Sequence, residues 1–237
     1  MMKKIVFALM ITAMLLVPIV LAKNDKQTEP LDKITFIHYK NGEVKQVGGV
    51  FNSPTCYKLM GIKWSTLQVE YVINPKNTQG LSESFICSAV TTSAETWDAA
   101  TSKELFKDYV GRDKCPINPE ATYGVQDYKN AITFGNYPTA NVIAVTSVWY
   151  TRPGKQIVEF DVMFDTDFKW GDATSNPTVM DLQNIATHEL GHAVGLDDIY
   201  SKSCTAVTMY GYSSNGEIQK RTLEQPDITG LRMVYGA

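Results

Sequence analysis

Two histidines and a glutamate in one short segment have the types and spacing of a metal-dependent hydrolase. His188 and His192 are four residues apart, so on a helix both imidazoles lie on one face and can bind one ion. Glu189 stands beside them, where it can take a proton from a water that the metal activates. Gly195 allows a left-handed turn at the end of that helix, which can return a third ligand to the metal. The segment 188–198 has the pattern H-E-x-x-H-x-x-G-x-x-D and predicts a zinc site with one position open to water.

The third ligand is predicted to be a carboxylate. The sequence has three histidines, and His38 lies far upstream, where we interpret it as a structural or surface residue remote from the metal. Asp198 stands at the ligand position of the pattern, and zinc accepts carboxylate oxygens at about 2.0–2.2 Å. Asp197 is the competing candidate, which we interpret as a carboxylate at the helix end or one that supports the ligands.

The zinc pattern and three further segments resemble the metzincin metallopeptidases, most closely the matrixin type. The segment 206–210, Ala-Val-Thr-Met-Tyr, is similar to the Met-turn beneath the metal, with Met209 as its thioether. The segment 164–170 is similar to the F-D-x-D-x-x-W stretch that precedes the zinc helix, and 223–236 is similar to the closing helix of matrixin domains. The resemblance covers about residues 62–236 and departs from the usual pattern in having Asp where most relatives have a third His.

The resemblance implies an α+β fold of the zincin or metzincin type. Such a fold has a mixed twisted sheet with an antiparallel edge strand, two long helices, a Met-turn and a C-terminal helix. The edge strand would be Val142–Tyr150, whose free N–H and C=O groups can pair with an extended peptide. A polypeptide substrate and a catalytic Zn²⁺ ion follow, with Glu189 as general base. The candidate substrate-binding residues are Val142, Ala144, Thr146 and Tyr212.

The sequence matches only part of the further metal sites and of the cysteine latency switch that relatives have. Asp161, Asp165 and Asp167 offer the oxygen ligands that suit Ca²⁺, but Phe168 stands where relatives often carry a further acid. Three histidines are too few for the additional His-rich structural zinc site of many matrixins. Cys56 lacks the motif that surrounds the matrixin thiol switch, so we interpret it as a disulfide cysteine.

Hydrophobic periodicity and turn signals predict the elements that position these residues. We expect a strand, a helix, a short strand and then a two-stranded hairpin, over residues 67–73, 82–100, 131–134, 142–150 and 156–164. Asn176 is expected to cap a helix that begins at Pro177 and continues to Val194. Pro226 falls in the first turn of the last helix, where its missing N–H costs little.

The beginning of the chain has the features of a secretory signal. Two lysines precede an apolar run over 5–21, and small residues at its end offer a cleavage site. An uncleaved membrane anchor is the alternative, because the run approaches the length of a span, but Pro18 and the polar residues that follow favour cleavage. We therefore expect a secreted protein with no membrane contact after cleavage, divided into a signal peptide, an N-terminal extension or short propeptide, and a catalytic domain at 1–22, 23–61 and 62–237.

Composition and charge limit the class of protein. Hydrophobic residues make up 44% of the sequence, and the 215 residues after the signal suit one catalytic domain. The formal net charge of −3 argues against a nucleic acid partner, and we expect a monomer. Four cysteines in an exported chain predict two disulfides. Three pairings are open, and we favour Cys87–Cys115 and Cys56–Cys204.

Peptide hydrolysis is the predicted function, by a secreted zinc metalloendopeptidase. One alternative is a non-catalytic secreted protein that keeps the zinc fold as a binding or adhesion module. Glu189 argues against it, because a purely structural zinc site needs no general base. A second alternative is a metal-dependent hydrolase of other substrates, against which only the resemblance and the expected edge strand argue.

Overall fold

The fold is built on one mixed sheet. The computed structural model describes residues 30–40, 55–109 and 115–237, so the signal peptide expected at 1–22 lies outside the described residues. Six described strands form the sheet in the order β2-β3-β5-β4-β1-β8. Their bounds are β1 Leu31–Lys40, β2 Val72–Ile73, β3 Ala131–Gly135, β4 Val142–Thr151, β5 Ile157–Asp165 and β8 Tyr212–Ser213.

The centre of the sheet agrees with the sequence prediction. β2, β3 and β5 run parallel, whereas β4 and β5 form the expected antiparallel hairpin, with Ala144 opposite Phe164 and Val148 opposite Phe160. The strand predicted over 67–73 is shorter than expected and keeps only the two residues of β2 in the sheet. β4 is the antiparallel edge strand of the sheet that residues 62–237 form, as predicted.

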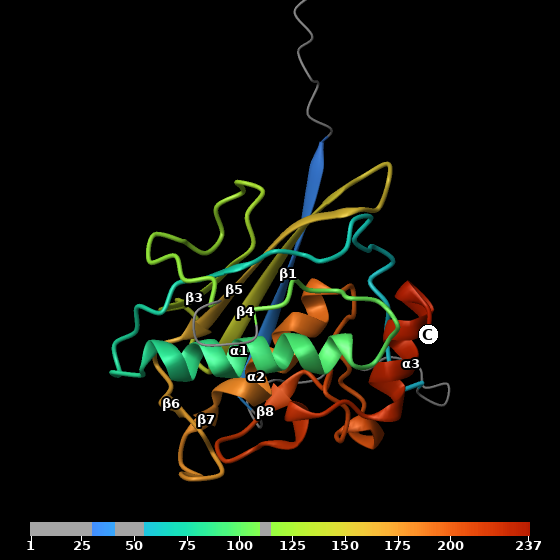
Figure 1. Cartoon of the computed structure of the whole chain (residues 1–237). Helices are drawn as coiled ribbons and strands as arrows, with labels where there is room; N and C mark the ends of the chain where they lie inside the picture. Colours follow the sequence, from blue (N-terminus) through green and yellow to red (C-terminus); the bar gives the residue numbers. More distant parts are fainter. Residues whose placement is uncertain (1–29, 41–54, 110–114) are drawn as a thin grey trace, which may run out of the picture.

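Strand β1 was not predicted, and it pairs along this edge. It runs antiparallel to β4, with Leu31 opposite Thr151 and His38 opposite Ala144, and its last two residues run parallel to β8. The blue arrow in Figure 1 lies beside β4 over most of its length. The alternation of Ile34, Phe36 and His38 toward one face is the period-2 signal that identifies this strand in hindsight.

Helix α1 (Glu83–Asp98) and helix α2 (Leu182–Ala193) lie together on one side of the sheet in Figure 1. Ser82 caps α1 by accepting a hydrogen bond from the Phe85 N–H. The predicted start of α2 at Pro177 is wrong, because the cap is Asp181, whose carboxylate accepts from the Asn184 N–H at 2.8 Å. Asn176 instead accepts from a backbone N–H within the preceding turn.

Two short strands, the 3₁₀ helices η1 (Lys202–Cys204) and η2 (Gln219–Arg221) and a last helix complete the described elements around α2. β6 (Trp170–Gly171) pairs in parallel with β7 (Met180–Asp181), which leads directly into α2. Helix α3 (Gln225–Tyr235) has Pro226 in its first turn, as predicted. The fold of the predicted class, with a mixed sheet, two long helices and a C-terminal helix, is therefore confirmed.

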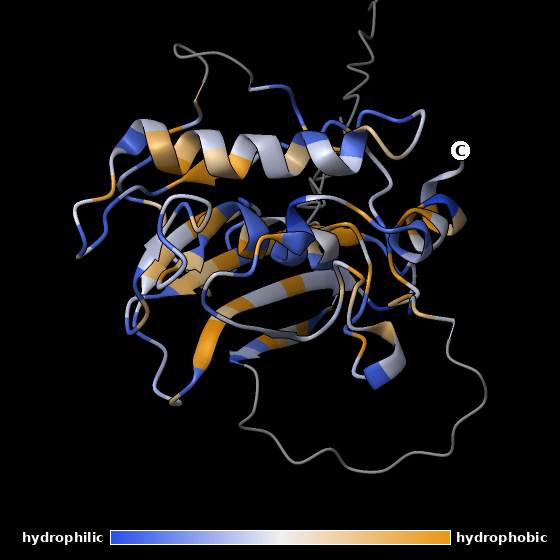
Figure 2. Cartoon of the chain, turned by 90° about the horizontal axis from the view of Figure 1, so that it is seen from below, coloured by the Kyte–Doolittle hydropathy of each residue, from blue (hydrophilic) through white to orange (hydrophobic). Residues whose placement is uncertain are grey.

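The main core lies between the sheet and the two long helices. Trp97 of α1 is fully buried there and donates from its indole N–H to the Thr187 carbonyl of α2 at 2.8 Å. Figure 2 shows many hydrophobic residues on the strands of the sheet and many hydrophilic residues in the connections. At the end of α1, Asp98 accepts from the Leu105 and Phe106 N–H groups, and burial raises its pKa to about 7.

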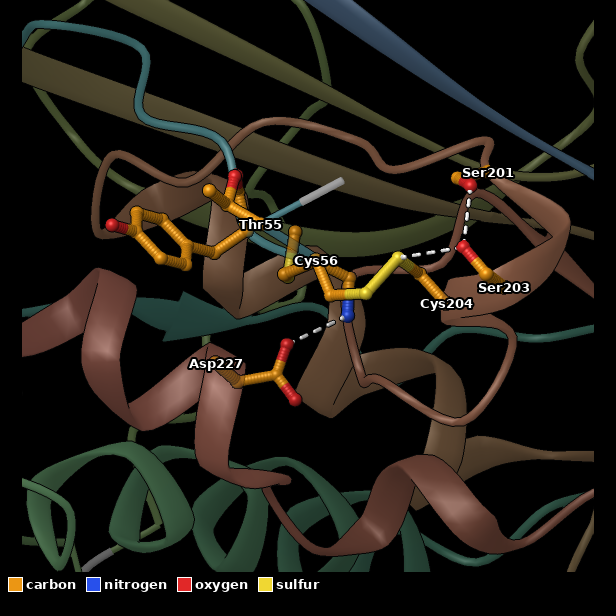
Figure 3. The surroundings of a disulfide bond; sticks show 8 residues. Thr55, Cys56, Ser201, Ser203, Cys204 and Asp227 are labelled. Atoms are coloured by element: carbon orange, nitrogen blue, oxygen red, sulfur yellow. Dashed lines mark hydrogen bonds between the residues drawn. A yellow bond between two sulfur atoms is a disulfide. The ribbon is translucent and has the colours of Figure 1, made fainter. Parts of the chain in front are cut away.

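Both favoured disulfides are present. Cys87–Cys115 joins α1 to the segment that follows it, and Cys56–Cys204 joins the N-terminal part of the domain to the segment before the predicted Met-turn, across 148 residues of sequence. Figure 3 shows the second bond, with Ser203 beside Cys204. In the part of the chain that the structure describes, no helix is long and apolar enough to cross a membrane.

Candidate metal and catalytic site

Helix α2 presents two buried imidazoles to one point. The Nδ1 atom of His188 lies 2.8 Å from the Thr208 carbonyl, and that of His192 lies 2.8 Å from the Leu196 carbonyl. Because a carbonyl only accepts, each Nδ1 carries a hydrogen, and in the neutral ring this leaves the lone pair on Nε2. The backbone therefore fixes both rings in the tautomer and orientation that a metal ligand needs.

A tight turn returns Asp198 to these two rings. Gly195 has φ +94°, and a Cβ added there would lie 2.6 Å from the Ile62 carbonyl oxygen, so only glycine fits. Asp198 Oδ1 lies 3.2 Å from His188 Nε2 and 3.6 Å from His192 Nε2. The other carboxylate oxygen, Oδ2, accepts from the Tyr200 hydroxyl at 2.9 Å.

Asp197, the competing candidate, points away from the imidazoles. Its Oδ2 forms an ion pair with Lys58 at 2.6 Å, and its Oδ1 accepts from the Asp198 N–H at 2.8 Å. Its carboxylate thus supports the turn from outside, while Asp198 supplies the oxygen that faces both rings.

Three atoms at this point are buried without a hydrogen-bond partner among the described residues. They are His188 Nε2, His192 Nε2 and Asp198 Oδ1, and their ligand atoms lie within 4.8 Å of one another. Burial lowers the pKa of His188 to about 4, which keeps its imidazole neutral at pH 7. Burial raises the pKa of Asp198, but the two histidines overcome this and lower it well below its ordinary value. Burial lowers the pKa of His192, but the charge and hydrogen bond of Asp198 outweigh this and raise it. Two imidazoles and one carboxylate are a donor set that fits a catalytic zinc ion, which binds each imidazole in its neutral form.

Met209 packs against helix α2. It is buried, and a Cβ added at Gly191, between the histidines on α2, would lie 2.2 Å from its sulfur. Asp227 of α3 holds this turn by accepting from the Thr208 and Met209 N–H groups at 2.9 and 3.2 Å. We did not assign Asp227 a role from the sequence, although an acid in the first turn of a helix is a common backbone-capping residue.

Glu189 is fully buried beside the three candidate ligands. Its Oε2 accepts from the Thr146 hydroxyl at 2.5 Å, and its Oε1 lies 3.1 Å from His38 Nδ1. Burial raises the pKa of its carboxyl group, as suits a group that exchanges protons near neutral pH.

The interpretation of His38 as a residue remote from the metal is wrong. Its side chain is buried, its Nε2 lies 3.1 Å from the Ser213 hydroxyl, and its ring centroid lies 4.0 Å from that of His188. The pairing of β1 with β4 brings it there across 151 positions of sequence from Glu189. Sequence distance therefore gave a misleading estimate of spatial distance.

Comparison with known proteins identifies the family. The family model for matrixin matches residues 63–236, which is most of the chain and includes every candidate ligand. The chain belongs to the matrixin family.

Individual matrixins are similar to this chain at modest identity. Stromelysin-1 of Rattus norvegicus is 25% identical over 214 residues, which are 89% of this chain and 40% of that protein. Matrilysin of Homo sapiens is 40% identical over 76 residues, which are 32% of this chain and 27% of that protein. The chain thus spans well under half the length of these relatives.

The residues proposed to bind substrate lie on the edge of this matrixin domain, and each of the four is paired with β1. Three lie on β4 and face β1 in the antiparallel register, whereas Tyr212 lies on β8 and faces it in the parallel register. The pairs are Val142 with Tyr39, Ala144 with His38, Thr146 with Phe36, and Tyr212 with Tyr39.

The three aspartates considered for calcium do not converge in this matrixin. Asp161 and Asp165 each accept two backbone N–H hydrogen bonds, and Asp167 supplies one of those to Asp165. These three are not among the described groups of His, Cys, Asp and Glu whose ligand atoms lie close together. The carboxylates of Asp161 and Asp165 thus bind backbone N–H groups around β3 and β5.

Proposed function

We propose that this chain is a secreted zinc-dependent endopeptidase that hydrolyses peptide bonds of extended polypeptides. The observation that carries the proposal is the convergence of three partnerless, buried ligand atoms, from His188, His192 and Asp198, beside Glu189. Membership of the matrixin family supports it independently. A zinc ion held by these three residues supplies Lewis acidity toward a carbonyl and makes water more acidic.

The remaining chemistry belongs to the chain's own groups. Glu189 acts as general base, taking a proton from water at its carboxylate and passing it to the leaving amine, for a factor of about 10²–10⁴ in rate. Thr146 donates to one Glu189 oxygen and so orients the carboxylate. An extended polypeptide would pair with the backbone groups at the edge of β4, beside the base; in the described structure β1 pairs with these groups.

Secretion is part of the proposal. The predicted signal peptide at 1–22 supports it, and so do the two disulfides, because such bonds persist in oxidising compartments outside the cytosol. We take residues 23–61 as an N-terminal extension or short propeptide and 62–237 as the catalytic domain of a monomer. The net charge of −3 supports a polypeptide rather than a nucleic acid as partner.

The test compares the zinc-loaded chain with Glu189→Gln on an unfolded protein substrate. The products are identified by mass spectrometry after long incubation, so that slow turnover is detected. Glutamine keeps the size of the side chain and an oxygen acceptor for Thr146, so zinc content should persist while cleavage falls about 10²–10⁴-fold.

Three measurements decide between the proposal and its alternatives. A chelator should abolish cleavage by the parent chain, and added zinc should restore it. Equal cleavage by parent and variant would show that Glu189 is not the base. A parent chain that binds zinc stoichiometrically and cleaves no substrate would instead favour the non-catalytic binding module.

A further inference from the structure

Three carboxylates converge at the end of helix α1, on residues that the proposed catalysis does not use. Glu95 lies in the last turn of the helix, whereas Glu104 and Asp108 lie in the segment that follows it. One oxygen of each lies within 4.8 Å of an oxygen of each of the other two. Oxygens that bind one Ca²⁺ ion at about 2.3–2.6 Å lie at most about 5 Å apart, so this spacing suits a shared cation.

No basic side chain balances the charge of this cluster. Among the residues that the structure describes, none of the three carboxylates forms an ion pair. Lys107 lies in the same segment but pairs with Glu70, at 2.5 Å. Burial raises the pKa of the Glu95 carboxyl group, and the neighbouring Asp108 and Glu104 raise it further. Carboxylates this close repel one another unless a cation or a proton lies between them.

A buried carboxylate beside the cluster has an oxygen without a partner. Asp98 is 9% exposed and lies three residues after Glu95, on the same face of α1. Its Oδ1 accepts from the Leu105 and Phe106 N–H groups, whereas its buried Oδ2 has no hydrogen-bond partner among the described residues. Burial raises the pKa of Asp98, the two N–H groups lower it, and the charges of Glu104 and Glu95 raise it again. A buried polar atom of this kind calls for an ion or a bound water.

Tyr71 supplies a second buried atom of the same kind. Its side chain is 2% exposed, and its hydroxyl has no hydrogen-bond partner among the described residues. Its ring packs edge-on against Phe106 and Tyr109, the residues that flank the segment carrying Asp108. Burial raises the pKa of this hydroxyl, and Tyr109 and Glu95 raise it further. Two separate segments of the chain therefore leave a buried polar atom unpaired beside the same carboxylates.

We propose that Glu95, Glu104 and Asp108 bind a Ca²⁺ ion that joins the end of α1 to the segment after it. An oxygen-only donor set suits Ca²⁺, which takes about six to eight ligands in flexible geometry, so bound waters complete its shell. Such waters also provide partners for the Asp98 and Tyr71 oxygens. Mg²⁺ fits less well, because it requires a near-ideal octahedron with ligands at about 2.0–2.1 Å.

The test measures Ca²⁺ binding by titration calorimetry and the melting temperature by circular dichroism. All chains are full-length and zinc-loaded, and all carry Glu189→Gln so that self-cleavage cannot imitate a change in stability. The site variant, Glu104→Gln/Asp108→Asn, removes two charges from exposed side chains and keeps their size. The matched control, Glu120→Gln/Asp127→Asn, makes the same two changes at exposed acids that pair with lysines instead.

We expect one Ca²⁺ ion per parent chain, with a Kd of about 10⁻⁴–10⁻³ M, as in extracellular calcium modules. At a Kd of about 10⁻³ M, about 10 mM Ca²⁺ raises the ratio of folded to unfolded chain about tenfold and the melting temperature by about 3–6 °C. The control should respond as the parent does. The site variant should melt at or above the parent without Ca²⁺, because two repelling charges are gone, and below it with Ca²⁺. A poorly folded variant would not show this reversal.

Four outcomes would overturn the proposal. Equal Ca²⁺ binding by the parent and the site variant would show that these carboxylates are not the ligands. A parent chain that binds no Ca²⁺ at about 10 mM would leave Glu95 and Asp108 as a pair that shares a proton. Loss of binding in Asp167→Asn, with the site variant unaffected, would place the ion in the region that the sequence suggested. An equal shift of the melting temperature with Mg²⁺ would show screening of charge instead of a built site.

Discussion

Gly195→Ala should destabilise the chain more than a matched glycine substitution in a neighbouring loop, and the structure sets the difference. Gly195 and Gly61 both have positive φ, +94° and +73°, so alanine costs roughly 1–2 kcal/mol of backbone strain at either position. Around Gly61 the added Cβ meets nothing within 4 Å, whereas at Gly195 it lies 2.6 Å from the Ile62 carbonyl oxygen. Overpacking of this kind costs about 1–3 kcal/mol further.

The assay is urea unfolding of the zinc-free chain, with both disulfides intact, followed by circular dichroism. We expect Gly61→Ala to lower the free energy of unfolding by about 1–2 kcal/mol and Gly195→Ala by about 2–5 kcal/mol. Because the Leu196 carbonyl orients His192, zinc affinity should also fall, by about 10–100-fold, in the second variant alone. Equal losses of stability in the two variants would refute the claim that the close approach to Ile62 requires glycine.

Three further outcomes are expected. Asp198→Ala should lower zinc content and cleavage strongly while Asp197→Ala changes both little, and elemental analysis showing the reverse order would identify Asp197 as the ligand. The pKa of Asp98 is raised from 3.8 to about 7, so between these pH values the folded chain keeps a proton that the unfolded chain has lost. Stability should therefore fall as the pH rises from about 4 to 7. In Asp98→Asn, the melting temperatures at pH 4 and pH 7 should differ less than in the parent chain. Reduction of Cys56–Cys204, which closes a loop of 148 residues, should cost up to about 5 kcal/mol in the chain-entropy model, and an unchanged urea midpoint would contradict it.

The site itself was largely predictable, because its chemistry lies in one short segment. The spacing of His188 and His192 needs only a helix, and the position of Asp198 needs only a tight turn at Gly195, so local geometry places all three. Their convergence could be predicted without any knowledge of the sheet. The same holds for the β4–β5 hairpin, whose partners are adjacent in sequence.

The misplaced features depend on contacts between distant parts of the chain. Asn176 and Asp181 are equally good capping residues in type, and only the pairing of β7 with β6 makes Asp181 the one at which the helix begins. β1 is separated from its partner β4 by about a hundred residues, so no local pattern specifies where it pairs. His38 was misplaced for this reason, because its distance from the metal site depends on where β1 pairs.

The contact between Tyr200 and Asp198 has a consequence for how this site can change by mutation. The aspartate is shorter than a histidine, and Tyr200 bonds its second oxygen while a Cβ at Gly211 would lie 2.4 Å from the Tyr200 ring. The residues at 198, 200 and 211 are therefore epistatic. An imidazole at position 198 needs space that Tyr200 occupies, and so does a side chain at position 211. A single substitution at either position should therefore give a less stable variant than one made together with a change at Tyr200. In a double-mutant cycle, Asp198→His should be tolerated better with Tyr200→Ala than alone. We therefore expect the exchange of the proposed aspartate ligand for histidine to be coupled to Tyr200 and Gly211, and not to be a neutral substitution.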